Sequence, residues 1–331
     1  MRRLIRTLLI FAFLVLAATA GWFWYFSEQK LSLPTTPFEF VVKPGASLKS
    51  LSRQLTEAGL TKEPYSLWLL GRATEQAAKI RAGSYQLDAP ITPMALLRKL
   101  NEGVVVPMSI TFIEGSTFAD MRAQIEADEN VRVTLKGLSD GELLKRIGAV
   151  EKHPEGLFFP DTYRFAAGAT DLELFKMAYQ TMQKKLAETW ASRAPNLPYK
   201  SPYEALIMAS IIEKETGRAE ERTTIGSVFV NRLRIPMRLQ TDPTVIYGMG
   251  ARFDGNIRKR DLTADTPYNT YTRDGLPPTP IALPGLGSLQ GALKPATADY
   301  LYFVGKGDGS HYFSRSLVEH NRAVAKYQLG R

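Results

Sequence analysis

The sequence predicts an α+β fold in which an N-terminal transmembrane helix precedes a β-α-α-β portion and a mixed α/β domain. Three patterns support this fold: a charge-free N-terminal run, strand and helix periodicities after residue 38, and a strongly apolar helix among Pro/Gly-rich loops after residue 156. With 331 residues, 44% of them hydrophobic, the chain is long enough for two or three folded units. We therefore expect four segments, at 1–26, 27–37, 38–155 and 156–331.

The first segment has the features of a membrane anchor. Residues 7–26 carry no charge, follow three arginines, and are about as long as a helix that spans hydrocarbon. The positive-inside rule predicts a single-pass protein of the inner (cytoplasmic) membrane, with its N-terminus in the cytoplasm and the remainder in the periplasm. The alternative is a cleaved signal peptide, because Ala18-Thr19-Ala20 fits the small-residue cleavage pattern. The aromatic residues 22–26 favour the anchor, since they extend the apolar run and suit the outer interface.

A short stalk and a β-α-α-β portion are expected next. Residues 27–37 are polar with two prolines, which is typical of a linker. Residues 38–42 alternate like a strand, and Ser47 stands as an N-cap before leucines at helical spacing. A second helix at 65–71 and a second strand at 83–87 complete the unit.

Composition excludes several classes of site. The chain has no cysteine, so it forms neither disulfides nor thiolate metal sites. Its three histidines, His153, His311 and His320, are far apart in sequence, and no metalloprotease, serine-hydrolase or phosphate-loop motif is present. The net charge of +9 is scattered, which suits an acidic polymer better than nucleic acid. We expect no metal, no cofactor and no nucleic-acid partner.

One apolar helix carries two carboxylates at its end. The pattern predicts a buried helix over 202–217, stopped by Gly217. Glu213 and Glu215 lie about 200° apart around its axis, so only one of them can enter a given cleft. Glu215 follows apolar neighbours, which would keep its carboxyl group protonated as a general acid. The alternative is that both glutamates are solvated or ion-paired residues of a helix end.

Several polar loop blocks follow this helix, and as a set they are specific. They are rich in Asn, Gln, Thr, Tyr and Asp, the side chains that hydrogen-bond to sugars or stack on them; the blocks are 227–233, 237–248, 268–271, 275–278, 300–304 and 311–313. Together with the helix ending in Glu213-Lys214-Glu215-Thr216, they resemble the endolytic murein transglycosylase (YceG-like) family over nearly the whole chain.

The resemblance implies a LysM-like portion before the catalytic domain and a lytic transglycosylase activity. Such a lyase cleaves within nascent peptidoglycan strands, between N-acetylmuramic acid and N-acetylglucosamine, and leaves 1,6-anhydromuramic ends. The catalytic acid and base of the family falls on Glu215. Without water, Glu215 would protonate the glycosidic oxygen and then accept the proton of the muramic 6-hydroxyl as that oxygen closes on the anomeric carbon.

Further expectations concern the surroundings of the reaction. Gln240, Asp242, Asn269 and Tyr271 are candidates for positioning the substrate, although each could equally fix a loop, and Glu213 is a candidate supporting residue. Membrane anchoring would keep the site on new strands and near peptidoglycan synthases (penicillin-binding proteins). Two alternatives stay open: a non-catalytic membrane-anchored peptidoglycan-binding scaffold, and a hydrolase that uses water and leaves reducing ends.

Overall fold

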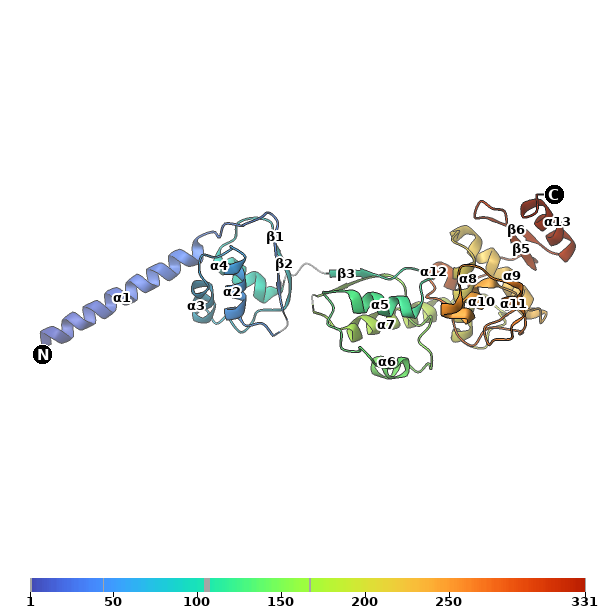
Figure 1. The fold of residues 1–331 in the computed structure, drawn as a ribbon. Helices are drawn as coiled ribbons and strands as arrows, with labels where there is room; N and C mark the ends of the chain where they lie inside the picture. Colours follow the sequence, from blue (N-terminus) through green and yellow to red (C-terminus); the bar gives the residue numbers. More distant parts are fainter. Residues whose placement is uncertain (1, 44, 104–107, 167, 331) are drawn as a thin grey trace. The chain divides into compact units, whose positions relative to one another are not determined.

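The computed structural model describes residues 2–43, 45–103, 108–166 and 168–330. Contacts divide the chain into two compact units, and each is described by itself (Figure 1). Unit 1 contains Met1–Ser109, Asn130–Arg132 and Arg164–Ala169; unit 2 contains Ile110–Glu129, Val133–Tyr163 and Thr170–Arg331. The boundary expected near residue 155 lies inside unit 2. There the buried Glu155 carboxylate accepts hydrogen bonds from Phe118 N at 2.9 Å and Tyr247 Oη at 3.1 Å.

The chain begins with helix α1 (Arg2–Glu28). Its segment Arg6–Glu28 has a mean hydropathy of 2.0 and is long and apolar enough to cross a membrane, as predicted. The last turns of α1 reach the folded part, because Phe23 and Phe26 pack against the core of unit 1. Leu31, from the expected stalk, also packs there, and its backbone N–H donates to Ile91 O at 2.9 Å.

Unit 1 contains the predicted β-α-α-β order followed by one more helix. Its elements are β1 (Phe38–Val42), α2 (Leu48–Glu57), α3 (Tyr65–Ala73), β2 (Gly83–Leu87) and α4 (Pro93–Glu102). Ser47 caps α2 by accepting from Ser50 N, as expected from its place in the sequence. β1 and β2 pair antiparallel, and Phe40 stacks on Tyr85 across the pair with ring centroids 5.5 Å apart.

The first part of unit 2 is a layer formed by the helices α5 (Phe118–Ala127), α6 (Asp140–Ile147) and α7 (Asp171–Ala191). The strands β3 (Met108–Thr111) and β4 (Thr162–Phe165) pair with each other, and the division into units falls within both of them. Capping boxes begin α5, α6 and α7, at Thr117, Ser139 and Thr170. The rings of Phe118, Phe158 and Phe175 contact one another at centroid distances of 5.3–5.9 Å and fill the layer.

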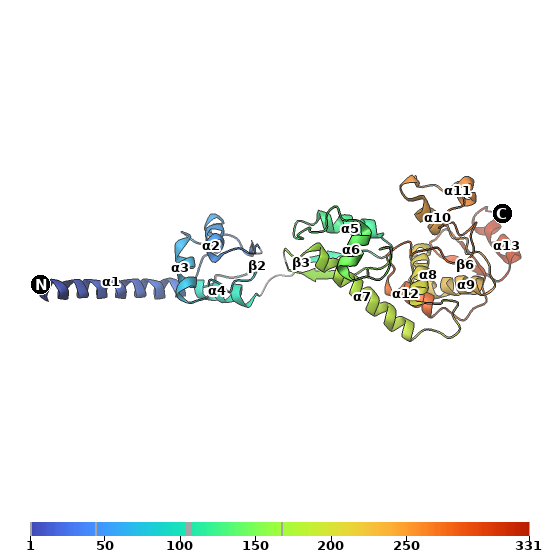
Figure 2. The ribbon, with the colours of Figure 1, turned by 90° about the horizontal axis from the view of Figure 1, so that it is seen from below.

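Helices that pack around α8 form the next part of unit 2 (Figure 2). The elements are α8 (Pro202–Glu215), η1 (Ala219–Glu221), α9 (Arg222–Arg234), α10 (Asp242–Met249), η2 (Gly250–Arg252), α11 (Lys259–Thr263) and α12 (Leu286–Leu293). α9 and α12 can approach closely because Gly226 has no Cβ. A Cβ at this position would lie only 2.1 Å from Gly291 O. α8 ends at Glu215, since Thr216 is extended, and so it stops before the predicted Gly217.

A hairpin and a helix complete the chain. β5 (Tyr302–Gly305) pairs antiparallel with β6 (His311–Ser314), and α13 (Leu317–Tyr327) packs on both strands. Phe303 of β5 meets Phe229 of α9 with ring centroids 5.8 Å apart, which joins the hairpin to the helices. The hairpin therefore brings the first residue of β6, His311, close to the helices that surround α8.

Candidate active site

Glu215 ends helix α8 inside a cleft of about 440 Å³, a size typical of ligand pockets. The helix is buried along Ala205–Ile212, which fixes its last turn against the core. Glu215 itself is only partly exposed. The cleft is lined by residues from α8, α9, α10, the β5–β6 hairpin and α13. The carboxyl group of Glu215 is therefore held on a rigid element and still reaches a ligand-sized space.

Thr241 contacts Glu215 directly. Its hydroxyl donates a hydrogen bond to Glu215 Oε1. Thr241 is also the N-cap residue of α10, where a threonine hydroxyl ordinarily accepts from the first turn of the helix. Here no such cap bond forms, so the hydroxyl serves the glutamate instead. This exchange gives up a stabilising contact of about 1 kcal/mol in favour of the site.

A buried threonine network holds Thr241 in place. Thr241 N donates to Thr270 Oγ1 at 3.1 Å, and the hydroxyls of Thr244 and Thr270 lie 2.9 Å apart. The preceding residue, Gln240, has φ +49°, a left-handed conformation that is costly for a residue other than glycine. Its backbone N–H donates to Thr270 O at 3.1 Å, which helps to hold that conformation. The strained turn carries Gln240 into the cleft lining.

Asp242 and Tyr271 form a second polar pair in the cleft. Tyr271 Oη donates to Asp242 Oδ1 at 2.6 Å. Asp242 is the first residue of α10, where the helix dipole favours a carboxylate. Burial, and then the neighbouring Asp242 carboxylate, raise the pKa of Tyr271, so its phenol stays protonated near neutral pH. The pair thus presents a fixed anion near Glu215.

Arg232 of α9 is a buried cation that lines the cleft. Its guanidinium donates to three backbone carbonyls, including Leu301 O at 2.7 Å and Leu239 O at 2.7 Å. Only 7% of the residue is exposed, and burial lowers its pKa from the usual value. No carboxylate among the described residues lies within ion-pair distance of it. Its charge is therefore available to an anion in the cleft.

Glu221 holds the ring of His311. The two oxygens of Glu221 accept from His311 N at 2.9 Å and contact His311 Nδ1 at 2.6 Å. This bidentate arrangement fixes the ring orientation, and His311 lines the cleft. His320 of α13 lines it too. The two histidines thus lie on the wall of the same cleft.

The surroundings of Glu215 raise its pKa to about 7. Desolvation by burial is the largest cause, and the negative charge of Asp242 acts in the same direction. The hydrogen bond from Thr241 and the charges of His311 and Arg232 oppose the rise. A carboxyl group with this pKa donates a proton and takes one back near neutral pH.

The other two predicted site residues lie outside this cleft. Glu213 points to the opposite side of α8, where Oε1 pairs with Arg222 Nη2 at 3.0 Å and Oε2 accepts from Gly285 N at 2.8 Å. Asn269 is 1% exposed, and its side-chain amide donates to three carbonyls of the α11 segment, at 2.7–3.2 Å. Both residues fix neighbouring elements, whereas Gln240, Asp242 and Tyr271 gather around Glu215.

Four residues that line the cleft or contact its lining were not proposed as site residues from the sequence. Thr241 and Arg232 lie within the polar blocks but look like an ordinary cap and an ordinary surface cation. Glu221 and His311 are 90 positions apart, so no local spacing pairs them. Among the described residues, no group of three or more His, Cys, Asp or Glu side chains could hold a metal ion. The chemistry available in the cleft is therefore proton transfer between a poised carboxyl group and a bound substrate.

Comparison with known proteins identifies relatives over most of the chain. The profile of the YceG-like family matches residues 40–326. The endolytic murein transglycosylase of Bacillus subtilis is 36% identical over 269 residues, which cover 76% of this chain and 74% of that protein. The endolytic murein transglycosylase of Streptococcus pneumoniae is 26% identical over 95% of this chain, which spans 64% of that longer protein. The crystal structure of a putative YceG-like protein from Listeria monocytogenes is 28% identical, with a TM-score of 0.56 over 86% of this chain and 98% of that one.

Proposed function

The chain belongs to the YceG-like family, and from this premise we propose that it is an endolytic murein transglycosylase in which Glu215 is the catalytic acid and base. The observation that carries the assignment of the residue is the position of Glu215. It is the carboxyl group at the end of a buried helix, in a ligand-sized cleft, with a pKa raised to about 7. Its protonated and ionised forms are both populated near neutral pH.

The first step is protonation of the glycosidic oxygen between N-acetylmuramic acid and N-acetylglucosamine. Glu215 gives its proton to the leaving oxygen as the bond to the anomeric carbon breaks. Positive charge then develops at that carbon, and the Asp242 carboxylate, held by Tyr271, stabilises it. Gln240 and His311 line the same cleft and would contact the bound sugars.

The second step returns the proton. The Glu215 carboxylate accepts the proton of the muramic 6-hydroxyl while its oxygen bonds to the anomeric carbon, which forms the 1,6-anhydro ring without water. Between the two steps the carboxylate is stabilised by the Thr241 hydroxyl and by the positive charge of Arg232. Glutamate therefore ends the cycle in the protonated form in which it began.

The test uses the full chain in detergent with purified glycan strands, and mass spectrometry of the new ends. Wild type should make internal cuts that end in 1,6-anhydromuramic acid, and Glu215→Gln should reduce the rate at least a thousand-fold. Glu220→Gln, which removes an exposed carboxylate of η1, is the matched control and should keep full activity. Reducing ends would show a hydrolase. Binding without any cuts would show a scaffold.

The N-terminal part would determine where the reaction takes place. We propose that α1 anchors the chain in the inner membrane, with the N-terminus in the cytoplasm and both units in the periplasm. The β1–β2 sheet with α2 and α3 would be the LysM-like portion. Anchoring would keep Glu215 on strands that leave the membrane-bound peptidoglycan synthases, so the cuts would end strand elongation.

Two measurements test this placement. Protease added outside sealed spheroplasts should digest the two units and spare the first turns of α1; full protection would refute the orientation. Crosslinking in intact membranes followed by capture of the anchored chain should recover a synthase, and recovery of none would count against that partner.

A further inference from the structure

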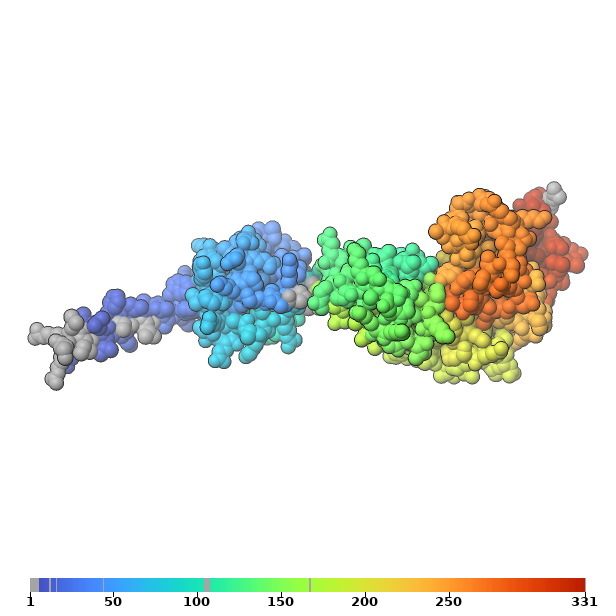
Figure 3. All heavy atoms as spheres, turned by 60° about the horizontal axis from the view of Figure 1, so that its bottom comes forward, coloured from blue at the N-terminus to red at the C-terminus, as the bar shows by residue number. Residues whose placement is uncertain are grey.

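Outside the catalytic cleft, a second hollow of about 300 Å³ lies at the far end of α10. Gly248 and Met249 of that helix contribute to its lining, and its charged lining consists of three arginines, Arg252, Arg258 and Arg260, together with Asp254 and Asp261. The segment that carries the arginines stands at the surface of unit 2, among the orange atoms of Figure 3. Three guanidinium groups against two carboxylates leave the hollow with an excess of positive charge.

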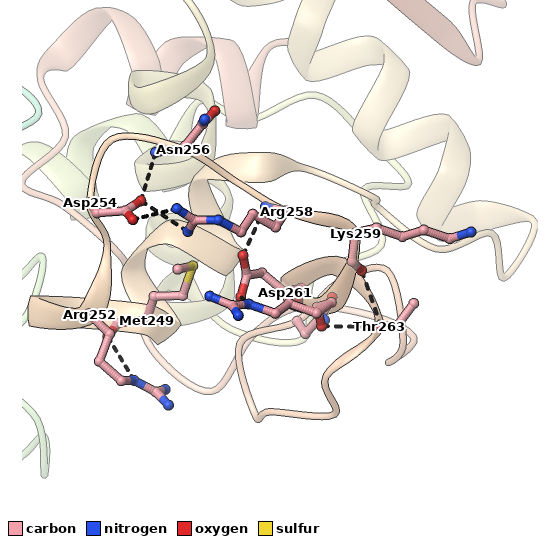
Figure 4. Close-up of polar contacts among 10 residues, drawn as sticks. Met249, Arg252, Asp254, Asn256, Arg258, Lys259, Asp261 and Thr263 are labelled. Atoms are coloured by element: carbon pink, nitrogen blue, oxygen red, sulfur yellow. Dashed lines mark hydrogen bonds and ion pairs between the residues drawn. The ribbon is translucent and has the colours of Figure 1, made fainter.

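The carboxylates of the hollow are already engaged. Asp254 accepts from both terminal nitrogens of Arg258, at 2.6 and 3.2 Å, and from Asn256 N at 3.3 Å (Figure 4). Asp261 accepts from Arg258 N at 2.8 Å and lies 3.7 Å from Arg260 Nε. Arg258 is thus a structural residue of the loop, and its charge is balanced within it.

Arg252 differs from Arg258. Its side chain makes one long contact, from Nε to Met249 O at 3.5 Å, which is at the limit of a hydrogen bond (Figure 4). Among the described residues, no carboxylate lies within ion-pair distance of its guanidinium. Arg260 has a single long ion pair and a side chain that is 76% exposed. Two guanidinium groups in the hollow are therefore free to bind an external carboxylate, and guanidinium geometry suits a bidentate contact.

A buried side chain fixes the loop that forms one wall of the hollow. Asn269, which is 1% exposed, donates to the carbonyls of Asp261, Leu262 and Ala264. These contacts fix the end of α11, so the arginines project from an ordered loop. An ordered loop loses less conformational entropy on binding a ligand than a mobile one.

Helix α10 connects the hollow with the catalytic cleft. Its first residue, Asp242, lines the cleft with Glu215, and its last residue, Met249, lines the hollow. Seven residues of helix correspond to about 10 Å along the axis, at roughly 1.5 Å each. An extended peptide covers that distance in about three residues. A short peptide attached to a sugar in the cleft is therefore long enough to reach the arginines.

From this geometry we propose that the arginine hollow binds a carboxylate of the stem peptide that hangs from the muramic residue in the cleft. The proposal rests on the proposed function, because it takes the muramic sugar to be bound beside Glu215. It adds that peptide-bearing strands are preferred over strands without peptides. The hollow contributes to binding alone, since it touches no reacting atom.

The test compares the wild-type full chain with Arg252→Gln and Arg260→Gln on two substrates: strands with intact stem peptides, and the same strands after an amidase has removed the peptides. For each variant, KM for peptide-bearing strands should rise about ten-fold with kcat unchanged, because one charge-assisted contact is lost equally from ground and transition states. KM for strands without peptides should stay within about two-fold of wild type. Lys259→Gln is the matched control, since this exposed cation of the same loop does not line the hollow.

Each outcome decides the proposal. The proposal is supported if both arginine variants have a raised KM on peptide-bearing strands alone. Raised salt should also raise the wild-type KM on these strands, because it screens the contact between the arginines and the carboxylate. Equal losses on both substrates would overturn it, because the arginines would then act on the glycan or on folding, and unchanged kinetics on both would overturn it as well. Cleavage of neither substrate by the wild-type chain would instead refute the proposed function. The proposal for the hollow would then fail too, because it assumes that the muramic sugar is bound beside Glu215.

Discussion

The contact between Thr241 and Glu215 provides a direct test of how the site adjusts its acid. Thr241→Val keeps the size and branching of the side chain and removes only the hydroxyl that donates to Glu215. That hydrogen bond stabilises the carboxylate and so lowers the pKa of Glu215. Its loss should therefore raise the pKa of Glu215 above the value of about 7 in the wild type.

The size of the shift follows from the energy of the bond. A hydrogen bond to a charged group contributes about 1.5–3 kcal/mol, and one pKa unit corresponds to about 1.4 kcal/mol. Glu215 is partly exposed, so water replaces part of the lost contact. We therefore expect a rise of about one unit, which would place the pKa of Glu215 near 8.

The assay is the pH dependence of kcat/KM on glycan strands. This quantity reports the free enzyme, so it should be flat below pH 7 in the wild type and fall about ten-fold per unit above it. In Thr241→Val this fall, which is the alkaline limb of the pH profile, should begin near pH 8. The plateau should also drop several-fold, because the carboxylate is less well stabilised between the two steps. Thr244→Val is the matched control: its hydroxyl belongs to the same network but bonds to Thr241 O and Thr270 Oγ1, so the limb should not move.

Two results would refute this reasoning. An alkaline limb that stays near pH 7 in Thr241→Val would mean that the hydroxyl does not act on the titrating group. A limb that moves equally in Thr244→Val would mean that the network as a whole, and not the single contact, determines the pKa.

Three further predictions concern stability. Burial raises the pKa of Glu155 from 4.5 to about 7, so the wild type should lose up to about 3 kcal/mol of unfolding free energy as pH rises from 4.5 through 7, and Glu155→Gln should remove this loss in denaturant titrations. Glu213→Gln should lower the unfolding free energy by about 2 kcal/mol, because it breaks the pair with Arg222, yet leave the alkaline limb near pH 7. Gly226→Ala should lower it by at least about 2 kcal/mol, because the new Cβ would overlap Gly291 O.

Each of these predictions has a result that would contradict it. The Glu155 effect must vanish below pH 4.5, where the carboxyl group is protonated in the folded and unfolded states alike; a variant that is equally stabilised at every pH would contradict it. A Glu213→Gln variant with a shifted limb would place Glu213 in the proton chemistry. Gly141→Ala is the control for Gly226, since nothing lies within 4 Å of a Cβ there and helix α6 should gain stability; equal effects of the two substitutions would refute the packing argument.

Local pattern was sufficient for two strands and one buried helix. The strands at 38–42 and 83–87 and the helix α8 were predicted because alternation and apolar continuity are properties of a few neighbouring residues. The end of α8 was placed two residues too late, since the extended Thr216, and not a left-handed glycine, ends the helix. A threonine has no strong preference that the sequence could have revealed.

The site was less predictable because its contacts join distant segments. Glu215 and Thr241 are 26 positions apart, and nothing in the spacing shows that the N-cap hydroxyl turns away from its own helix. Asn269 illustrates the opposite difficulty. A buried amide bonds equally well to a sugar or to backbone carbonyls, and only the fold shows that Asn269 satisfies three carbonyls of the α11 segment.

A residue that must first give a proton and then take one back works best when neither form is strongly favoured. Burial and Asp242 favour the acid, whereas Thr241, His311 and Arg232 favour the carboxylate, and the two sets nearly balance at a pKa of about 7. An ordinary glycosidase resolves the same difficulty with two carboxylates that have separate tasks. Here Asp242 is held by Tyr271 at the start of α10. Because the charge of Asp242 raises the pKa of Glu215, Asp242→Asn should move the alkaline limb below pH 7, and it should lower the plateau because the anomeric carbon loses its stabilising carboxylate. A hydrolase with Asp242 as its nucleophile would instead lose nearly all activity at every pH.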